Sequence, residues 1–328
     1  MSRFLRRRAL LAASMVFALP ALPITAFAQG YPDHSVKLTV GFPPGSGPDV
    51  VARLIGQKLG ETLKQTVVID NRAGAGGQIA TNGVAKGTPD GYNILLAEVG
   101  SIAIAPPAFS KLPYDPAKEL QVVTEVVRAD FLLVVPTTSK YKTIAEFMAG
   151  GKAAKQSVYF ATFGAGTPGH FGAEILAEAG GFDAEPIHYR STGDAVTSII
   201  NGDVAGAFVS VALGSAQIKG GKMRALATTA KQRLPTVPDV PTFAESGLPK
   251  VDFSAWFAFF VPAGTPDAVV DKLNKALVES TQSPEVKQKL VAAGFSVTGT
   301  SQAEAEKLVK SEAPRWEKIV KQTGFKGD

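Results

Sequence analysis

Residues 36–63 read VKLTVGFPPGSGPDVVARLIGQKLGETL, and they combine the three parts of one structural unit. The apolar run at 36–42 predicts a β-strand, and the prolines and glycines that follow end it. Apolar residues then recur at helical spacing over 49–63, which predicts an amphipathic helix. A strand, a glycine-rich turn and a helix in this order indicate an α/β protein.

The same unit returns in the second half of the chain, where FGAGTPGH occupies residues 163–170 between a predicted strand and a predicted helix. Further strand and helix patterns surround both units, and the C-terminal helices need a sheet to cover. We therefore expect two lobes with mostly parallel sheets and a cleft between them. The predicted extents are 31–135 plus 254–328 for lobe 1 and 136–253 for lobe 2.

The first 28 residues have the layout of a secretory signal peptide. Four arginines among residues 3–8 form a basic head, an apolar run follows, and the segment ends in the small-x-small pattern AFA at 26–28. We expect this segment to be removed during export. Because it carries four arginines and no acid, its removal lowers the formal net charge from +5 to +1.

Composition excludes several classes of function. A mature charge near zero gives no basic surface for nucleic acid or anionic membranes. The chain has no cysteine and three histidines without metal-ligand spacing, so we expect no metal. Gly164, Gly166 and Gly169 match a dinucleotide-binding spacing, but no acid ends the next predicted strand, so we expect no cofactor. No grouping typical of nucleophilic catalysis is visible, and no residue is predicted to be catalytic.

The two glycine-rich turns are the candidate ligand site. Free N–H groups at a helix start, together with the positive end of the helix dipole, favour an anion. Two such turns, one in each lobe, predict an anion held from both sides, although both could be plain strand-to-helix turns. We interpret Asp49 and Arg53 as a helix cap with an i,i+4 pair rather than as ligand contacts. For His170, packing inside the protein and a role in fixing the ligand loop both remain open.

Short motifs are spread along the whole mature chain: GFPPG at 41–45, DVVAR at 49–53, NRAGAGG at 71–77, PDGY at 89–92, LPYDP at 112–116 and PAGTP at 262–266. They resemble those of the Bug (TctC-type) family of periplasmic substrate-binding proteins of tripartite tricarboxylate transporters. The resemblance implies a Venus-flytrap fold and carboxylate recognition by the two turns, through main-chain groups and bridging waters. Ser46 replaces a usual glycine and Arg190 a usual lysine, so the identity of the ligand stays open.

The expected ligand contacts share a position in a turn or just beyond a strand end. Phe42 should supply an apolar wall, the serines hydroxyl groups, and Arg190 the nearest candidate for an ion pair. The full set is Phe42, Pro43, Gly45, Ser46, Ser101, Gly164, Ala165, Gly166, Thr167, Gly169, His170, Arg190 and Ser210.

We therefore expect a monomeric periplasmic solute-binding protein, and not an enzyme, that captures a small carboxylate and delivers it to membrane transporter subunits. One alternative is a ligand sensor whose closed form binds a signalling partner. A second alternative is an exported lyase-like enzyme, for which Glu98 at the end of a predicted strand is the candidate acid or base.

Overall fold

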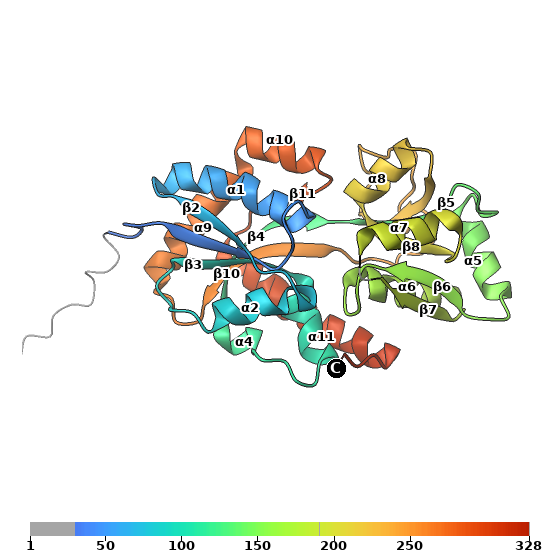
Figure 1. Ribbon diagram of the computed structural model, residues 1–328, viewed down its shortest axis with the longest axis horizontal. Coiled ribbons are helices and arrows are strands. Elements are labelled where there is room, and N and C mark those ends of the chain that lie inside the picture. Colours follow the sequence, from blue (N-terminus) through green and yellow to red (C-terminus); the bar gives the residue numbers. More distant parts are fainter. Residues whose placement is uncertain (1–29, 190, 328) are drawn as a thin grey trace, which may run out of the picture. The chain divides into compact units, whose positions relative to one another are not determined.

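Two β-sheets of matching design organise the protein (Figure 1). The computed structural model describes residues 30–189 and 191–327. The expected signal peptide and Arg190 lie outside the described residues, so both remain predictions.

The first sheet contains, in spatial order, β11 (Ser296–Val297), β4 (Leu120–Ala129), β10 (Ala255–Pro262), β3 (Asn93–Glu98), β1 (Val36–Val40) and β2 (Val67–Asn71). Strands β1, β2 and β3 are parallel to one another, as their β-α-β pattern predicts. β10 lies antiparallel between β3 and β4. The fold thus places the strand before the first glycine-rich turn beside β3.

Helices cover both faces of this sheet. They are α1 (Gly47–Leu63), η2 (Ala75–Gly77), α2 (Gln78–Ala85), the π-helical turn η3 (Gly100–Ile104), α3 (Ala105–Ala108), α4 (Pro116–Glu119), α9 (Asp267–Gln282), α10 (Pro284–Ala292) and α11 (Gln302–Thr323). Figure 1 shows α1 and α2 on opposite faces, which explains why β3 is apolar along nearly its whole length rather than at every second residue. Trp256 and Phe259 of β10 are fully buried in this core.

The second sheet contains, in spatial order, β7 (Ala184–His188), β6 (Val158–Thr162), β8 (Gly206–Ser210), β5 (Phe131–Pro136) and β9 (Met223–Thr228). Its helices are α5 (Ile144–Ala153), α6 (Pro168–Gly180), α7 (Thr192–Asn201) and α8 (Val211–Lys219). β6, β7 and β8 are parallel, and β5 lies antiparallel between β8 and β9. The order β7-β6-β8-β5-β9 therefore repeats the order β2-β1-β3-β10-β4 of the first sheet.

Several expectations need correction. Both sheets are mixed, because β5 and β10, the strands that follow the two crossings, run against the β-α-β strands. The strand at 131–135 was placed in lobe 1, but it pairs with β8 and β9 of the second sheet. An apolar strand fits either sheet, and its own sequence does not specify its partners. The first crossing therefore lies at Asp130, while the full extents of the lobes remain a prediction.

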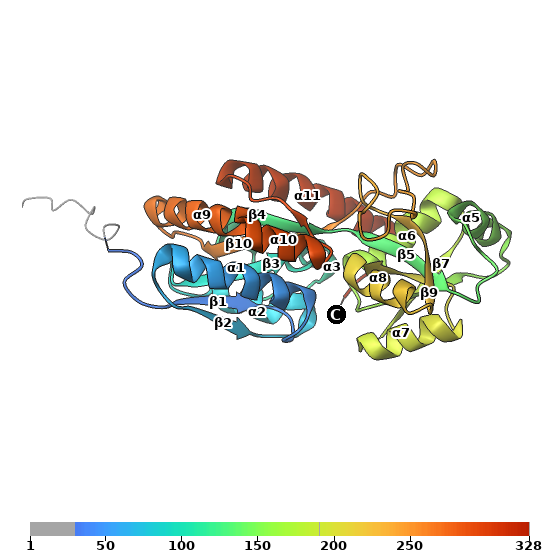
Figure 2. The same cartoon turned by 90° about the horizontal axis from the view of Figure 1, so that it is seen from above.

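The C-terminal helix is longer than its sequence suggests. Ser301 and Glu304 form a capping box at its start, and α11 continues through Pro314 to Thr323, although a proline inside a helix usually ends or kinks it. Trp316, two residues beyond the proline, is fully buried, and this packing favours continuation of the helix. Figure 2 shows α11 extending along the first sheet toward α6, with which it is in contact.

Candidate ligand-binding cleft

A cleft of about 560 Å³ lies where the two sheets face each other. Its walls come from the carboxyl ends of β1, β3, β6 and β8 and from the helices that follow β1, β6 and β8. In open α/β sheets this edge is the usual ligand site. The two glycine-rich turns predicted from the sequence both line it, through Gly45 and Ser46 on one side and Thr167 and Gly169 on the other.

The first turn is held by a buried carboxylate. Oδ2 of Asp49 accepts hydrogen bonds from the N–H of Gly45 (2.8 Å) and from Nε of Arg53 (2.9 Å), and Oδ1 accepts one from Asn71 (2.9 Å). Burial by itself raises the pKa of Asp49, but the hydrogen bonds from Arg53, Gly45 and Asn71 outweigh it, so the pKa lies below its ordinary value. Asp49 and Arg53 therefore form the predicted i,i+4 pair.

The second turn is held in the same way by a neutral side chain. The N–H of Gly166 donates to Nδ1 of His170 (3.1 Å), which is 3% exposed. Burial lowers the pKa of His170 to about 4, and the nearby His188 lowers it as well. His170 fixes the loop from inside and does not line the cleft.

The turn hydroxyls are also used within the loops. Ser46 Oγ donates to the carbonyl of Pro43 (2.6 Å), and Thr167 Oγ1 donates to the carbonyl of Gly164 (2.8 Å). A hydroxyl has one hydrogen to donate. In this conformation neither hydroxyl can donate to a carboxylate, contrary to the role expected for Ser46, although both residues line the cleft.

Four helices begin at the cleft. The lining includes the first residues of α1, α6, α7 and α8, among them Gly47, Gly169 and Ala212. Among the described residues, the N–H groups of these three make no hydrogen bond within the protein. Free N–H groups and the positive ends of helix dipoles together attract an anion. α6 and α8 have no acid in their first turn, whereas α1 has Asp49.

The cleft walls are otherwise apolar and aromatic. Six phenylalanines line it, and only two of them, Phe42 and Phe163, belong to the glycine-rich turns. The other four come from β5, β8, β10 and the connection after α10, and sequence reasoning missed them. They are Phe131, Phe208, Phe257 and Phe295.

Among the described residues, Glu98 is the only ionisable side chain that lines the cleft. It ends β3 opposite Phe257 of β10. Among the described residues no hydrogen bond or ion pair involves its carboxyl group, and burial raises its pKa to about 7. From its position in the sequence, Glu98 is predicted only as a candidate catalytic residue.

The structure brings together about half of the predicted contacts. Phe42, Gly45, Ser46, Thr167, Gly169 and Ser210 line the cleft. Pro43, Gly164, Ala165 and Gly166 belong to the two turns but are not part of the lining, and Gly166 lies against Phe109 instead. Ser101 is 2% exposed, and its hydroxyl accepts a hydrogen bond from Thr81 (3.0 Å), so it lies behind the cleft wall.

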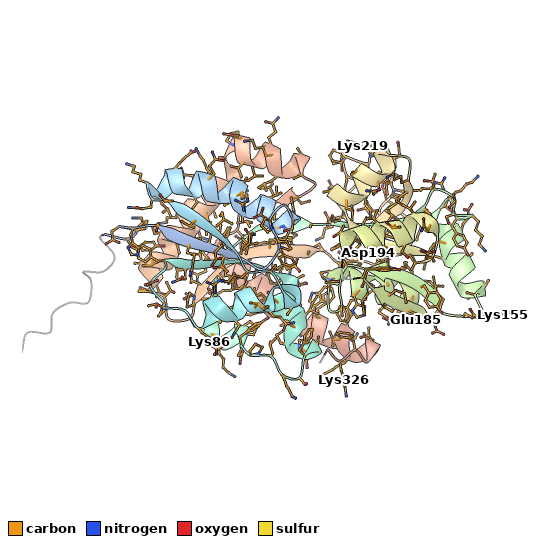
Figure 3. All side chains as sticks on the ribbon, in the orientation of Figure 1. Lys86, Lys155, Glu185, Asp194, Lys219 and Lys326 are labelled. Carbon is orange, nitrogen blue, oxygen red and sulfur yellow. The ribbon has the colours of Figure 1, made fainter. Side chains whose placement is uncertain are left out.

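Charged side chains lie mostly on the outside of the protein. The six charged side chains labelled in Figure 3, such as Lys86 and Lys219, are all exposed, and none of them lines the cleft. The described cleft lining contains no lysine or arginine. A carboxylate in the cleft would therefore meet main-chain N–H groups. In the part of the chain that the structure describes, no group of three or more metal-ligating side chains occurs.

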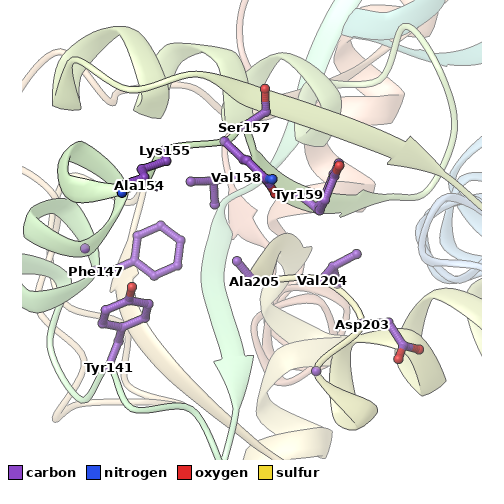
Figure 4. Close-up of a pocket in the computed structure, with 14 residues that line it drawn as sticks. Tyr141, Phe147, Ala154, Lys155, Ser157, Val158, Tyr159, Asp203, Val204 and Ala205 are labelled. Carbon is purple, nitrogen blue, oxygen red and sulfur yellow. The ribbon is translucent and has the colours of Figure 1, made fainter.

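Figure 4 shows another cavity of similar size, about 550 Å³, lined by Phe147, Lys155, Tyr159 and Asp203 among others. It lies at the amino ends of β6 and β8, at the opposite edge of the second sheet from the glycine-rich turn. Its described lining includes the C-terminal ends of α5 and α7 rather than helix starts, so the cleft is the candidate site for an anion.

Two α/β sheets with a ligand cleft at their facing edges define a two-lobed protein of the periplasmic binding protein type, and solved structures of that class share the fold. The chain belongs to the TctC family, the tripartite tricarboxylate transporter family receptors, whose model matches residues 51–325. Members of this family are solute-binding receptors, as the resemblance noted in the sequence implied. No described helix is long and apolar enough to cross a membrane.

Individual relatives cover nearly the whole chain. Protein BugT of Bordetella pertussis is 32% identical over 307 residues, which are 93% of this chain and 94% of BugT. The structure of MatC from Rhodopseudomonas palustris with bound malate has a TM-score of 0.78 and 30% identity, covering 88% of this chain and 100% of MatC. The structure of R. palustris Rpa4515 with adipate has a TM-score of 0.82 and 29% identity, covering 90% and 99%.

Proposed function

We propose that this protein is a periplasmic receptor that captures a small carboxylate in the cleft and delivers it to the membrane subunits of a tripartite tricarboxylate-type transporter. The observation that carries the proposal is the start of α6 and α8 at the cleft, with free N–H groups and no acid in either first turn. Family membership and the malate and adipate bound by two structural relatives support the same ligand class.

Export, oligomeric state and motion belong to the same proposal. The basic and apolar pattern of the first 28 residues supports export with cleavage after Ala28. The receptor acts as a monomer, and its lobes close on the ligand by rotation about the crossings near Asp130 and residues 253–254. Closure would surround the ligand with the apolar walls of both lobes.

We propose binding without catalysis. Acid–base chemistry on a small acid generally needs at least two placed groups, and Glu98 is the one ionisable side chain among the described cleft residues. A bound acid is therefore returned unchanged. Proton NMR of the acid after long incubation with the protein checks this, and any new product signal would favour the lyase-like alternative.

A thermal-unfolding experiment tests carboxylate capture. The purified protein is heated with benzoate, hexanoate, malate or adipate, and with benzamide and hexanamide as uncharged analogues of the same shape. An acid present at about 100 times its Kd should stabilise the folded protein by about 2.7 kcal/mol, and the amides should have little effect. The proposal would be contradicted if an acid and its amide stabilised the protein equally, or if none of the acids stabilised it.

The partner is tested separately. Deletion of the gene should abolish uptake of the identified acid by intact cells, and the ligand-bound protein should retain transporter subunits in a pull-down. Retention of a sensor protein with normal uptake would instead support the signalling alternative.

A further inference from the structure

The two sides of the cleft differ in charge character. On the side of the second sheet, α6 and α8 offer free N–H groups without an acid in their first turns. On the side of the first sheet, β3 brings the carboxyl group of Glu98 to the wall. A ligand that places one carboxylate at the helix starts therefore directs its other end toward Glu98.

In the described elements packed against β3, no positive group lies beside Glu98. Of the elements packed against β3, β10, α2 and η3 contain no charged residue. β1 contains only Lys37, which pairs with Asn93 at the opposite end of β3. A second ligand carboxylate near an ionised Glu98 would meet a like charge in a partly buried site, where repulsion is poorly screened.

The rest of the cleft wall is aromatic and suits the apolar part of a ligand. Phe257 lies directly opposite Glu98 in the sheet, and Phe42 and Phe163 are half-buried at the first position of each glycine-rich turn. Aromatic walls of this kind bind apolar or planar groups well and do not replace the hydration of a charge.

We propose that the cleft selects a carboxylate with a single acid group and an apolar body, and that Glu98 rejects a second acid group at the far end of the ligand. The inference rests on the proposed function and narrows its ligand class. The preferred ligand thus differs from malate and adipate, the dicarboxylates bound by two structural relatives.

Hexanoate and adipate provide the test, because they share one carbon chain and differ by one carboxylate. Calorimetry at about pH 8, where Glu98 is ionised, should give a Kd for adipate about tenfold higher than for hexanoate. Glu98→Gln keeps the size of the side chain and removes its charge, and it should bring the two Kd values within about threefold of each other. Benzoate should bind at least as tightly as hexanoate.

Glu174→Gln is the matched control. Glu174 is a second half-buried glutamate whose pKa is raised by burial, but it lies outside the cleft lining. This variant should keep the wild-type preference for hexanoate. If Glu98→Gln does not fold, the wild-type protein still decides the question: the preference should shrink between about pH 8 and about pH 6, because Glu98 becomes largely neutral while the ligand carboxyl groups, with pKa values of about 4 to 5.5, stay mostly ionised.

Three outcomes would overturn the inference: adipate binding as tightly as hexanoate to the wild-type protein at about pH 8, an unchanged preference in Glu98→Gln, or an equal loss of both acids in that variant. In all three cases carboxylate capture itself stands. If neither acid binds at all, the proposed function fails first.

Discussion

The turns at 42–49 and 163–170 share one hydrogen-bond plan and differ in the residue that completes it. In each turn a glycine with positive φ donates its N–H to the side chain four residues later, and a hydroxyl donates to the carbonyl three residues earlier. The matching bonds are Gly45 to Asp49 and Gly166 to His170, and Ser46 to Pro43 and Thr167 to Gly164.

The difference between Asp49 and His170 assigns the two turns different electrostatic roles. Asp49 is a negative charge in the first turn of α1, balanced from outside by Arg53, so it occupies the position that an anion would favour. His170 accepts its hydrogen bond without charge and leaves the start of α6 available. Under the proposed function, we therefore predict that a ligand carboxylate lies nearer the second turn than the first.

The largest expected effect comes from giving the second turn the acid of the first. His170→Asp would place an unpaired carboxylate at the start of α6, because no arginine occupies the position of Arg53 there. We expect carboxylate affinity to fall on the order of a hundredfold and stability by about 3 kcal/mol. His170→Asn keeps an uncharged acceptor for Gly166 and should bind within about threefold of wild type. Calorimetry and urea unfolding check both variants, and wild-type affinity in His170→Asp would refute the assignment.

The pH dependence of stability should distinguish the contribution of His170 in the second turn from that of Asp49 in the first, and this test needs no ligand. The folded protein holds His170 neutral with a pKa of about 4, below the ordinary value of 6.5, so the unfolded chain binds the proton first. Stability from this group is complete above about pH 6.5 and is lost as pH falls toward about 4, by about 3 kcal/mol in all. Asp49, with its lowered pKa, loses stability only below its ordinary value of 3.8. Urea unfolding at both ends of the window should show the loss, and His170→Asn should reduce it. If His170→Asn lost as much stability between these pH values as the wild type, the loss would belong to other groups, such as His188.

Removing the charge of Asp49 from the first turn should lower the stability of the protein but change its ligand affinity little. Asp49→Asn weakens the acceptor of three hydrogen bonds and removes the ion pair with Arg53, which keeps only its hydrogen bond to Asn71, for a loss of about 2 kcal/mol. If the ligand carboxylate lies at the second turn, its affinity should change by less than about threefold. A large gain or loss in calorimetry would place the carboxylate at the start of α1 instead.

The smallest effects should be equal in the two turns. Ser46→Ala and Thr167→Ala each remove one hydroxyl-to-carbonyl hydrogen bond within a loop, and each should cost about 1 kcal/mol of stability. Ligand affinity should fall only slightly, because a loop that has lost one internal hydrogen bond is less rigid. A tenfold loss of affinity in one variant alone would show that its hydroxyl turns toward the ligand after closure.

Local signals in the sequence identified both glycine-rich turns and the strand and helix around each. Gly45 and Gly166 adopt the positive φ values that glycine favours, +79° and +75°, so the pattern reflects a real backbone requirement. The pair Asp49 and Arg53 was also predictable, because i,i+4 contact within a helix is a local property.

The rest of the site depends on contacts between distant segments. Phe257 and Phe295 reach the cleft because β10 inserts beside β3 and β11 pairs with β4, and neither pairing follows from the apolar pattern of one strand. Ser101 looked suitable at a strand end, but η3 turns it toward Thr81, behind the wall. The position of Ser101 in the sequence does not tell whether its side chain faces the cleft or the interior behind the cleft wall.

The insertion of β10 also sets an order of assembly. All strands of the second sheet lie between Phe131 and Thr228, so that sheet can form from one continuous stretch of chain. The first sheet is complete only after Phe259 has paired with Leu96, which lies far earlier in the sequence. Contacts of such long separation form slowly. During folding the edge of β3 therefore stays unpaired until the distant segment that contains β10 reaches it, and we expect the first lobe to complete its sheet after the second.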